Sequence, residues 1–225
     1  MTRLSMFTLF LSALMLVSAP VCFGQILFQE DWESGEIDEN IWIPAPGWQI
    51  IDGVLDATGG ESGFTVQGDF TDFEFSADVM IVAEYIGFVM RAQDQDNMFM
   101  HQMGAGDANI WFHLKVDGAW APEQVPIESD LALEVDVWYR VKFIVDGNQT
   151  TCLMAELGEE LNEADHLMGT WENSTFAGGA IGFRHWGNEH GQYDNILVTS
   201  IGFEPSAVTP GHSLLDTWGS IKKGN

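Results

Sequence analysis

The sequence predicts an all-β fold in which antiparallel strands pack face to face as a sandwich. Many short segments alternate apolar and polar residues, glycine-rich turns separate these segments, and no long amphipathic helix lies among them. Period-two alternation indicates strands with one face on a core. About a dozen such strands at regular spacing are typical of a β-sandwich.

The first 24 residues are expected to be an export signal and not part of the fold. Arg3 supplies the positive start, residues 6–17 the apolar run, and the small residues before Gln25 suit cleavage. The apolar run is too short for a lasting membrane span. We therefore expect a secreted or periplasmic protein that is not integral to a membrane. Lipid attachment at Cys22 is the alternative.

Residues 25–203 are expected to form one sandwich domain, followed by a linker and a short helix in 204–225. A length of about 200 residues suits a single core. Residues 205–211 are the linker, and the apolar positions after it recur at helical spacing. These positions are Leu214, Leu215, Trp218 and Ile221. We expect this helix to dock on the sandwich or to bind a protein partner.

Charge and cysteine content narrow the function. The formal net charge is -26 at pH 7, with 34 acidic residues against 8 Lys and Arg. Such a surface argues against nucleic acid as a partner, because phosphate recognition needs Lys and Arg. Cleavage of the signal leaves Cys152 alone in an alternating segment, so we expect a buried structural thiol and no disulfide.

The expected strands follow in chain order from residue 26. Asp52-Gly53 marks a two-residue hairpin turn between residues 47–51 and 54–57. Residues 137–145 give the clearest strand, and the turn at 146–148 leads into a partner at 149–156. Further strands are expected at 26–28, 64–66, 73–81, 179–184 and 193–199. Residues 121–130 are expected to form a loop, and residues 157–170 a helical turn or an extended loop.

The stretch from Gly87 to Trp120 contains three more alternating segments. One parity is mainly apolar and is expected to face the core. Its members are Phe88, Met90, Ala92, Met98, Met100, Ile110, Phe112, Leu114 and Val116. The other parity holds planar rings and hydrogen-bonding groups, which suit a polar, ring-shaped ligand such as a sugar.

On the last strands, Arg184 and Trp186 share a parity and extend this polar-aromatic surface. We therefore expect a carbohydrate to bind on the concave face of the sandwich, where Arg and Gln donate to hydroxyls and Trp rings stack on the sugar. The expected ligand contacts are Arg91, Gln93, His101, Trp111, His113, Arg184 and Trp186. Trp120 is a further candidate for stacking.

Five segments of the chain follow one another in the order that a known group of β-sandwich domains shows. They are FQEDWESGEIDENIW, TDFEFSADV, IGFVMRAQDQDNMFM, VWYRVKFIVDGN and GGAIGFRHWGNEHGQYDNILVTS. Together they resemble the concanavalin A-like lectin/glucanase superfamily of jelly-roll domains over residues 26–200. Within that superfamily the chain is most similar to laminin-G-like or accessory sugar-binding domains. DFEFSADV with GFVMR is also similar to the 3-keto-disaccharide hydrolase domain family.

The resemblance implies a structural metal ion. In many sandwiches of this kind, Ca²⁺ joins an acidic residue near the first strand to an Asp in the last strand. Glu30, Asp31 and Asp194 hold these places here, and their oxygens are ligands that Ca²⁺ prefers. The alternative is that Asp194 caps hydrogen bonds of the final strand. No other cofactor is expected.

Residues 134–138 resemble the beginning of the Glu-x-Asp-x-Glu strand of family 16 glycoside hydrolases. Trp138 stands where that family has its final Glu, so the two carboxylates of retaining hydrolysis are not both present. We therefore expect binding and not catalysis. Two alternatives stay open. One is a glycan-active hydrolase of the 3-keto-disaccharide hydrolase type that uses His and Arg, and the other is a surface interaction module without a ligand.

Overall fold

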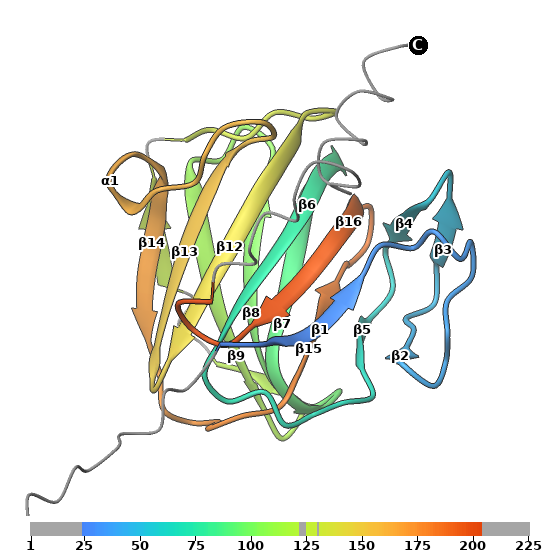
Figure 1. Cartoon of the computed structure of the whole chain (residues 1–225), viewed down its shortest axis with the longest axis horizontal. Coiled ribbons are helices and arrows are strands. Elements are labelled where there is room, and N and C mark those ends of the chain that lie inside the picture. The colour runs from blue at the N-terminus through green and yellow to red at the C-terminus, as the bar shows by residue number, and fades with distance from the viewer. Residues whose placement is uncertain (1–23, 122–124, 130, 204–225) are drawn as a thin grey trace, which may run out of the picture.

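Two antiparallel sheets hold every named strand of the protein (Figure 1). The structure, a computed structural model, describes residues 24–121, 125–129 and 131–203. The expected export signal and the expected helix after residue 204 lie outside these ranges. The two sheets stack face to face as a jelly-roll sandwich, which confirms the predicted fold class.

The sheet nearer the viewer in Figure 1 is called the front sheet. Its order is β14-β13-β12-β6-β16-β4-β3, and β1 pairs with β16 (Figure 1). The strands are β1 (Ile26–Glu30), β3 (Trp48–Ile51), β4 (Val54–Thr58), β6 (Phe73–Ala83), β12 (Trp138–Asp146), β13 (Gln149–Glu156), β14 (Leu167–Glu172) and β16 (His190–Thr199). The short helix α1 (Glu163–His166) precedes β14.

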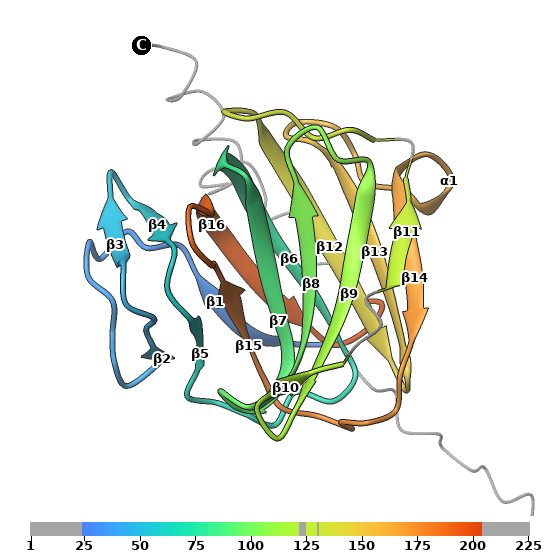
Figure 2. The same cartoon turned by 180° about the vertical axis from the view of Figure 1, so that it is seen from behind.

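The other sheet, nearer the viewer in Figure 2, is called the back sheet. Its order is β10-β9-β8-β7-β15-β5-β2, and β11 pairs with β9 (Figure 2). The strands are β2 (Trp42–Ile43), β5 (Ser62–Thr65), β7 (Tyr85–Asp94), β8 (Asn97–Gly104), β9 (Asn109–Val116), β10 (Ala119–Trp120), β11 (Val125–Glu128) and β15 (Ala180–Arg184).

Two hairpins show how local sequence sets the strand pairing. Asp52 and Gly53 have φ values of 52° and 74°, and a two-residue turn of this kind needs positive φ at both positions. This confirms the predicted turn between β3 and β4. Asp117 and Gly118 repeat it with φ values of 49° and 80° between β9 and β10. The second turn brings Trp120 opposite Lys115 at the edge of the back sheet.

Two strands of four or more residues were not predicted, and neither was the two-residue strand β2. β14 lies in the segment expected to be a helical turn or loop, and β11 lies in the proline-containing segment expected to be a loop. β14 alternates poorly because Gly169 takes a core-facing place, where an added Cβ would lie 2.8 Å from Ile127. β11 contains Pro126, which strands tolerate at a sheet edge, as here beside β9.

Aromatic side chains from both sheets fill the core between them. Phe143 of the front sheet lies 5.0 Å from Phe88 of the back sheet, measured between ring centroids. Tyr193 of the front sheet stacks on Phe183 of the back sheet at 3.9 Å. Cys152 lies unpaired in the same core, and burial raises the pKa of its thiol far above the ordinary value. It is therefore a structural thiol, as expected.

His101 does not lie on the polar face that the sequence predicted. Phe88 pairs with His101, and His101 pairs with Phe112, so the three side chains share the core face. His101 is fully buried, and its ring packs 4.7 Å from that of Phe112. In β8 the side chains that face the core are therefore those with the parity of His101. Met98 and Met100 lie on the other face of the back sheet, where both are buried. The predicted parity of this segment was wrong.

Burial of His101 predicts a loss of stability in acid. Burial, followed by the charge of His113, lowers the pKa of His101 to about 3, whereas the unfolded chain keeps a value near 6.5. The unfolded state therefore binds the proton more readily, and this contribution to stability is lost as pH falls below 6.5. We expect His101 to cost about 2 kcal/mol of unfolding free energy between pH 6.5 and pH 5.

Urea unfolding of the wild type and of His101→Phe at several pH values measures this contribution. Phe keeps the ring packing and removes the titrating group, so the pH dependence should become shallower by that amount. His166→Ala, which changes the last residue of α1, serves as the control. Equal pH dependence in wild type and His101→Phe would contradict the expectation.

Candidate functional site

A row of side chains crosses five strands on the outer face of the back sheet. Directly opposed residues of antiparallel strands share a face, so the register defines the row. Its members, from β5 to β9, are Ser62, Arg184, Gly87, Gln102 and Trp111. Phe183 and Phe88, next to Arg184 and Gly87 in sequence, point into the core. Alternation along each strand thus places the row outside.

Arg184 is the centre of this surface. Its guanidinium carbon lies 5.6 Å from the ring centroid of Trp120 and 5.6 Å from that of Trp186, so it has a cation–π contact with each. Gly87, beside Arg184 in the row, lets the backbones of β7 and β15 approach closely. A Cβ there would lie 2.6 Å from the Arg184 carbonyl oxygen.

Glu189, from the loop between β15 and β16, faces Arg184. Its Oε1 accepts a hydrogen bond from Gln102 Nε2 at 2.7 Å, and its Oε2 accepts one from the backbone N–H of Trp186 at 2.6 Å. Arg184 Nη1 lies 3.9 Å from the same Oε2, which is an ion pair beyond hydrogen-bond length. Burial raises the pKa of Glu189, and the charge of Arg184 partly opposes this shift.

His113 lies one row further along the same face. Its ring packs edge to face on Trp120 at 5.8 Å, and its Nε2 is buried without a hydrogen-bond partner. Burial, followed by the charge of Arg184, lowers the pKa of His113 to about 4. The imidazole is therefore neutral at pH 7 and has one unused hydrogen-bonding nitrogen.

Four of the seven predicted contacts belong to this surface: Trp111, His113, Arg184 and Trp186. Trp111 is half-buried, and its Nε1 donates to Asp107 at 3.0 Å, which fixes its ring. The prediction missed Gln102 and Glu189. Gln102 lies on the outer face of β8 once His101 is placed in the core. Glu189 lies in a loop, and no strand pattern could bring it to Arg184.

Arg91 and Gln93 are engaged elsewhere. Arg91 is 2% exposed and donates to the carbonyl oxygens of Thr71 at 2.6 Å and Phe176 at 3.1 Å. Its φ of 49° and the register shift between Met90 and Asp94 turn the side chain away from the alternating pattern. Gln93 donates to the carbonyl oxygen of Gly178. The predicted sugar contacts at these two positions are therefore corrected to structural ones.

The acidic residues expected to hold Ca²⁺ do not form a shared site. Glu30 accepts hydrogen bonds from the backbone N–H groups of Asp31 and Trp32 at 3.1 Å, and from Trp42 Nε1 at 3.3 Å. Asp194 is 3% exposed and accepts from the backbone N–H of Asn195. Within the ranges that the structure describes, no three His, Cys, Asp or Glu side chains gather as a metal site. The calcium site therefore stays a prediction.

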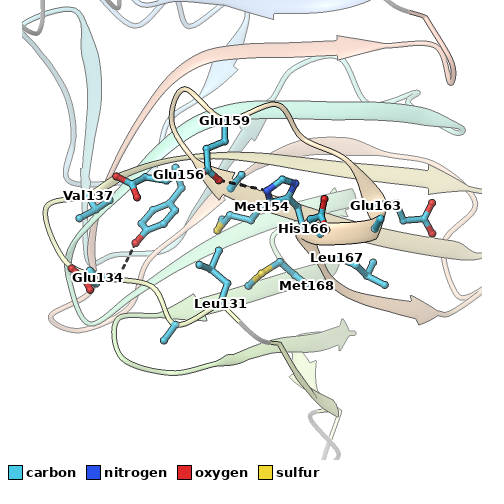
Figure 3. A pocket seen from close by; sticks show the side chains of 15 residues that line it. Leu131, Glu134, Val137, Met154, Glu156, Glu159, Glu163, His166, Leu167 and Met168 are labelled. Carbon is cyan, nitrogen blue, oxygen red and sulfur yellow. Dashed lines mark hydrogen bonds and ion pairs between the residues drawn. The ribbon is translucent and has the colours of Figure 1, made fainter.

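A second hollow lies at the edge of the sandwich beside α1 (Figure 3). Its volume is about 650 Å³, and its walls come from α1, β12, β13, β14 and residues 131–137. The thioethers of Met154 and Met168 lie between Glu134 and Glu163 in Figure 3. It contains none of the predicted contacts.

Comparison with solved structures defines the class of the fold. The carbohydrate binding module CBM66 from Bacillus subtilis superposes with a TM-score of 0.56 at 17% identity, covering 72% of this chain and 98% of that chain. The GH43 BlXynB protein from Bacillus licheniformis (TM-score 0.55, 12% identity) and the xyloglucan-locus GH43B of Bacteroides ovatus (0.52, 16%) match 76% of this chain and 38% of theirs. The chain is thus a concanavalin A-like sandwich, a fold shared by carbohydrate-binding and glycan-active proteins.

The family follows from the sequence. The chain belongs to the family described as the 3-keto-alpha-glucoside-1,2-lyase-like domain, whose model matches residues 27–199. This confirms the resemblance to the 3-keto-disaccharide hydrolase domain. The search of curated proteins found no match. Among the described residues, no helix is long and apolar enough to cross a membrane.

The placement of Arg91 predicts a structural role that binding assays will not reveal. We expect Arg91→Met to lower the free energy of unfolding by about 2–4 kcal/mol, because two carbonyl groups lose charged donors. Urea unfolding measures this change. Gln93→Ala, at an exposed position, should cost less than about 1 kcal/mol. Equal effects of the two substitutions would contradict the assignment.

Proposed function

We propose that the protein binds a carbohydrate on the outer face of the back sheet, around Arg184. One observation carries the proposal: a planar cation contacts two tryptophan rings beside a buried carboxylate that an amide holds. Sugar hydroxyls both donate and accept hydrogen bonds, and Arg184, Glu189 and Gln102 supply both kinds of partner. The family and the fold support the same class of ligand.

Arg184 Nη1 and Glu189 Oε2 lie 3.9 Å apart, so a hydroxyl group beside the pair can bridge them. It would accept from the guanidinium and donate to Glu189 Oε2, which keeps acceptor capacity beyond its bond to the Trp186 N–H. Trp186 is 63% exposed and offers its ring to an apolar face of the sugar. The export proposed from residues 1–24 would place this site outside the cytoplasm.

Binding should depend on Arg184. We expect Arg184→Gln to weaken the affinity for the best ligand of a glycan array roughly 10- to 100-fold, because charge-assisted hydrogen bonds contribute about 1.5–3 kcal/mol each. Isothermal titration calorimetry measures the change. Lys142→Gln removes a cation from the front sheet and serves as the matched control. The proposal fails if no glycan binds or if Arg184→Gln binds as well as the wild type.

A second candidate function is catalysis at the same surface. His113 has an unused nitrogen, Glu189 has a raised pKa, and the pKa of each responds to the charge of Arg184. In a 3-keto-α-glucoside the ketone acidifies the C2–H bond. A base can take that proton, the electron pair forms a C1=C2 bond, and the C1–O bond breaks as the aglycone oxygen gains a proton. No water is consumed in this elimination.

In this second function, neutral His113 would take the C2 proton, and Glu189 in its protonated form would give a proton to the aglycone oxygen. Arg184 would stabilise negative charge on the ketone oxygen. This assignment puts the base on a histidine that is neutral at pH 7, and the acid on a carboxyl group whose pKa burial raises. It also accounts for the burial of both groups.

The test uses a 3-keto-α-glucoside with detection of the unsaturated product. We expect His113→Gln and Glu189→Gln each to lower the rate roughly 100-fold or more, and His166→Ala to leave it unchanged. Because His113 must be neutral, the rate should fall as pH decreases through about 4. If the wild type forms no product, the catalytic function is excluded and only the binding function remains. Product formation at wild-type rates in both variants would remove these residues from the chemistry.

A further inference from the structure

The hollow beside α1 combines an apolar floor with an acidic rim. Its floor contains Met154, Met168 and Tyr139, which are buried members of the core. Leu167, at its wall, is 44% exposed. The apolar surface that the hollow of about 650 Å³ leaves in water comes from Leu167 and from the half-buried Leu131 and Val137, and a further group would bury it.

The rim carries five carboxylates and no Lys or Arg. They are Glu134, Glu156, Glu159, Glu163 and Asp165. His166, which lies 3.5 Å from Glu159, is the one lining residue that can carry a positive charge. A group that covers this hollow should therefore be apolar on one side and positively charged at its edge.

No cation of the described residues is free to supply that charge. The described ranges contain five Lys and Arg residues, and each is paired with a carboxylate outside the hollow. The pairs are Arg91–Asp72, Lys115–Asp96, Arg140–Asp78, Lys142–Glu74 and Arg184–Glu189. The positive charge that complements the acidic rim must therefore come from residues other than these five.

The sequence after residue 203 has the required composition. Leu214, Leu215, Trp218 and Ile221 recur at helical spacing, and Lys222 and Lys223 follow them directly. Ten residues lead from Phe203 to Ser213 and can span up to about 34 Å when extended, and a helix over residues 213–223 adds about 15 Å. The sum is comparable to the diameter of about 40 Å expected for a domain of this size. Attachment to the same chain also gives this segment an effective concentration of about millimolar, far above that of a free partner.

We propose that residues 213–223 dock on the hollow of the same molecule. The leucine, tryptophan and isoleucine side chains cover Leu131, Val137 and Leu167, and Lys222 and Lys223 face the carboxylates of the rim. The interaction removes exposed apolar surface and reduces repulsion among the five carboxylates. It is independent of the sugar-binding surface, which lies on the outer face of the back sheet.

Cross-linking of the full chain with a carbodiimide, which joins an amine to a nearby carboxylate, tests the contact. Peptide mapping should find Lys222 or Lys223 linked to Glu156, Glu159 or Glu163. A mixture of ¹⁵N-labelled and unlabelled protein should give links within one isotopic species. The yield should fall several-fold in Glu159→Gln/Glu163→Gln.

The matched control is Asp146→Gln/Glu172→Gln, which removes two exposed carboxylates of the front sheet outside the hollow and should leave the yield unchanged. Links that scatter over carboxylates outside the rim, or the absence of links, would overturn the proposal. Links between isotopic species would overturn docking within one molecule. Circular dichroism of each variant confirms that the fold is retained.

Discussion

The aromatic contact between the two sheets is the constraint on which the rest of the structure depends. Phe143 and Tyr193 of the front sheet pack against Phe88 and Phe183 of the back sheet, with centroid distances as short as 3.9 Å. Such rings bury much apolar area and have preferred geometries, so they define how the sheets face each other. Once Phe88 and Phe183 point inward, their neighbours Gly87 and Arg184 must point outward. The core thereby positions the site.

The site needs contributions that no single strand can make. β15 supplies Arg184, β8 supplies Gln102, and β9 supplies His113, while Trp120 and Glu189 come from a hairpin and a loop. Glu189 is held by Gln102 and by the Trp186 backbone, so its carboxylate is oriented before any ligand arrives. Preorganised groups of this kind lose little entropy when a ligand binds. If the proposed function holds, this arrangement would favour a defined sugar geometry over loose surface adhesion.

The sequence allowed prediction of most strands because alternation and Asp-Gly turns act locally, as at Asp52 and Gly53. It also placed Arg184 and Trp186 correctly on one surface. It failed at His101 and Arg91 for a physical reason. A bulge shifts the register after Met90, and a buried histidine reads as polar although its ring packs against Phe112. Glu189 was missed because only the fold brings its loop to Gln102.

Charge explains why recognition at this surface should rest on hydrogen bonds and stacking. The chain has a net charge of -26, which repels polyanions over about a Debye length of 8 Å at physiological salt. Within the site, Glu189 offsets the charge of Arg184, and the lowered pKa of His113 keeps its ring neutral. The local net charge is therefore close to zero. A neutral glycan loses less solvation on entering such a site than a charged one, so under the proposed function its hydroxyl pattern would decide the affinity.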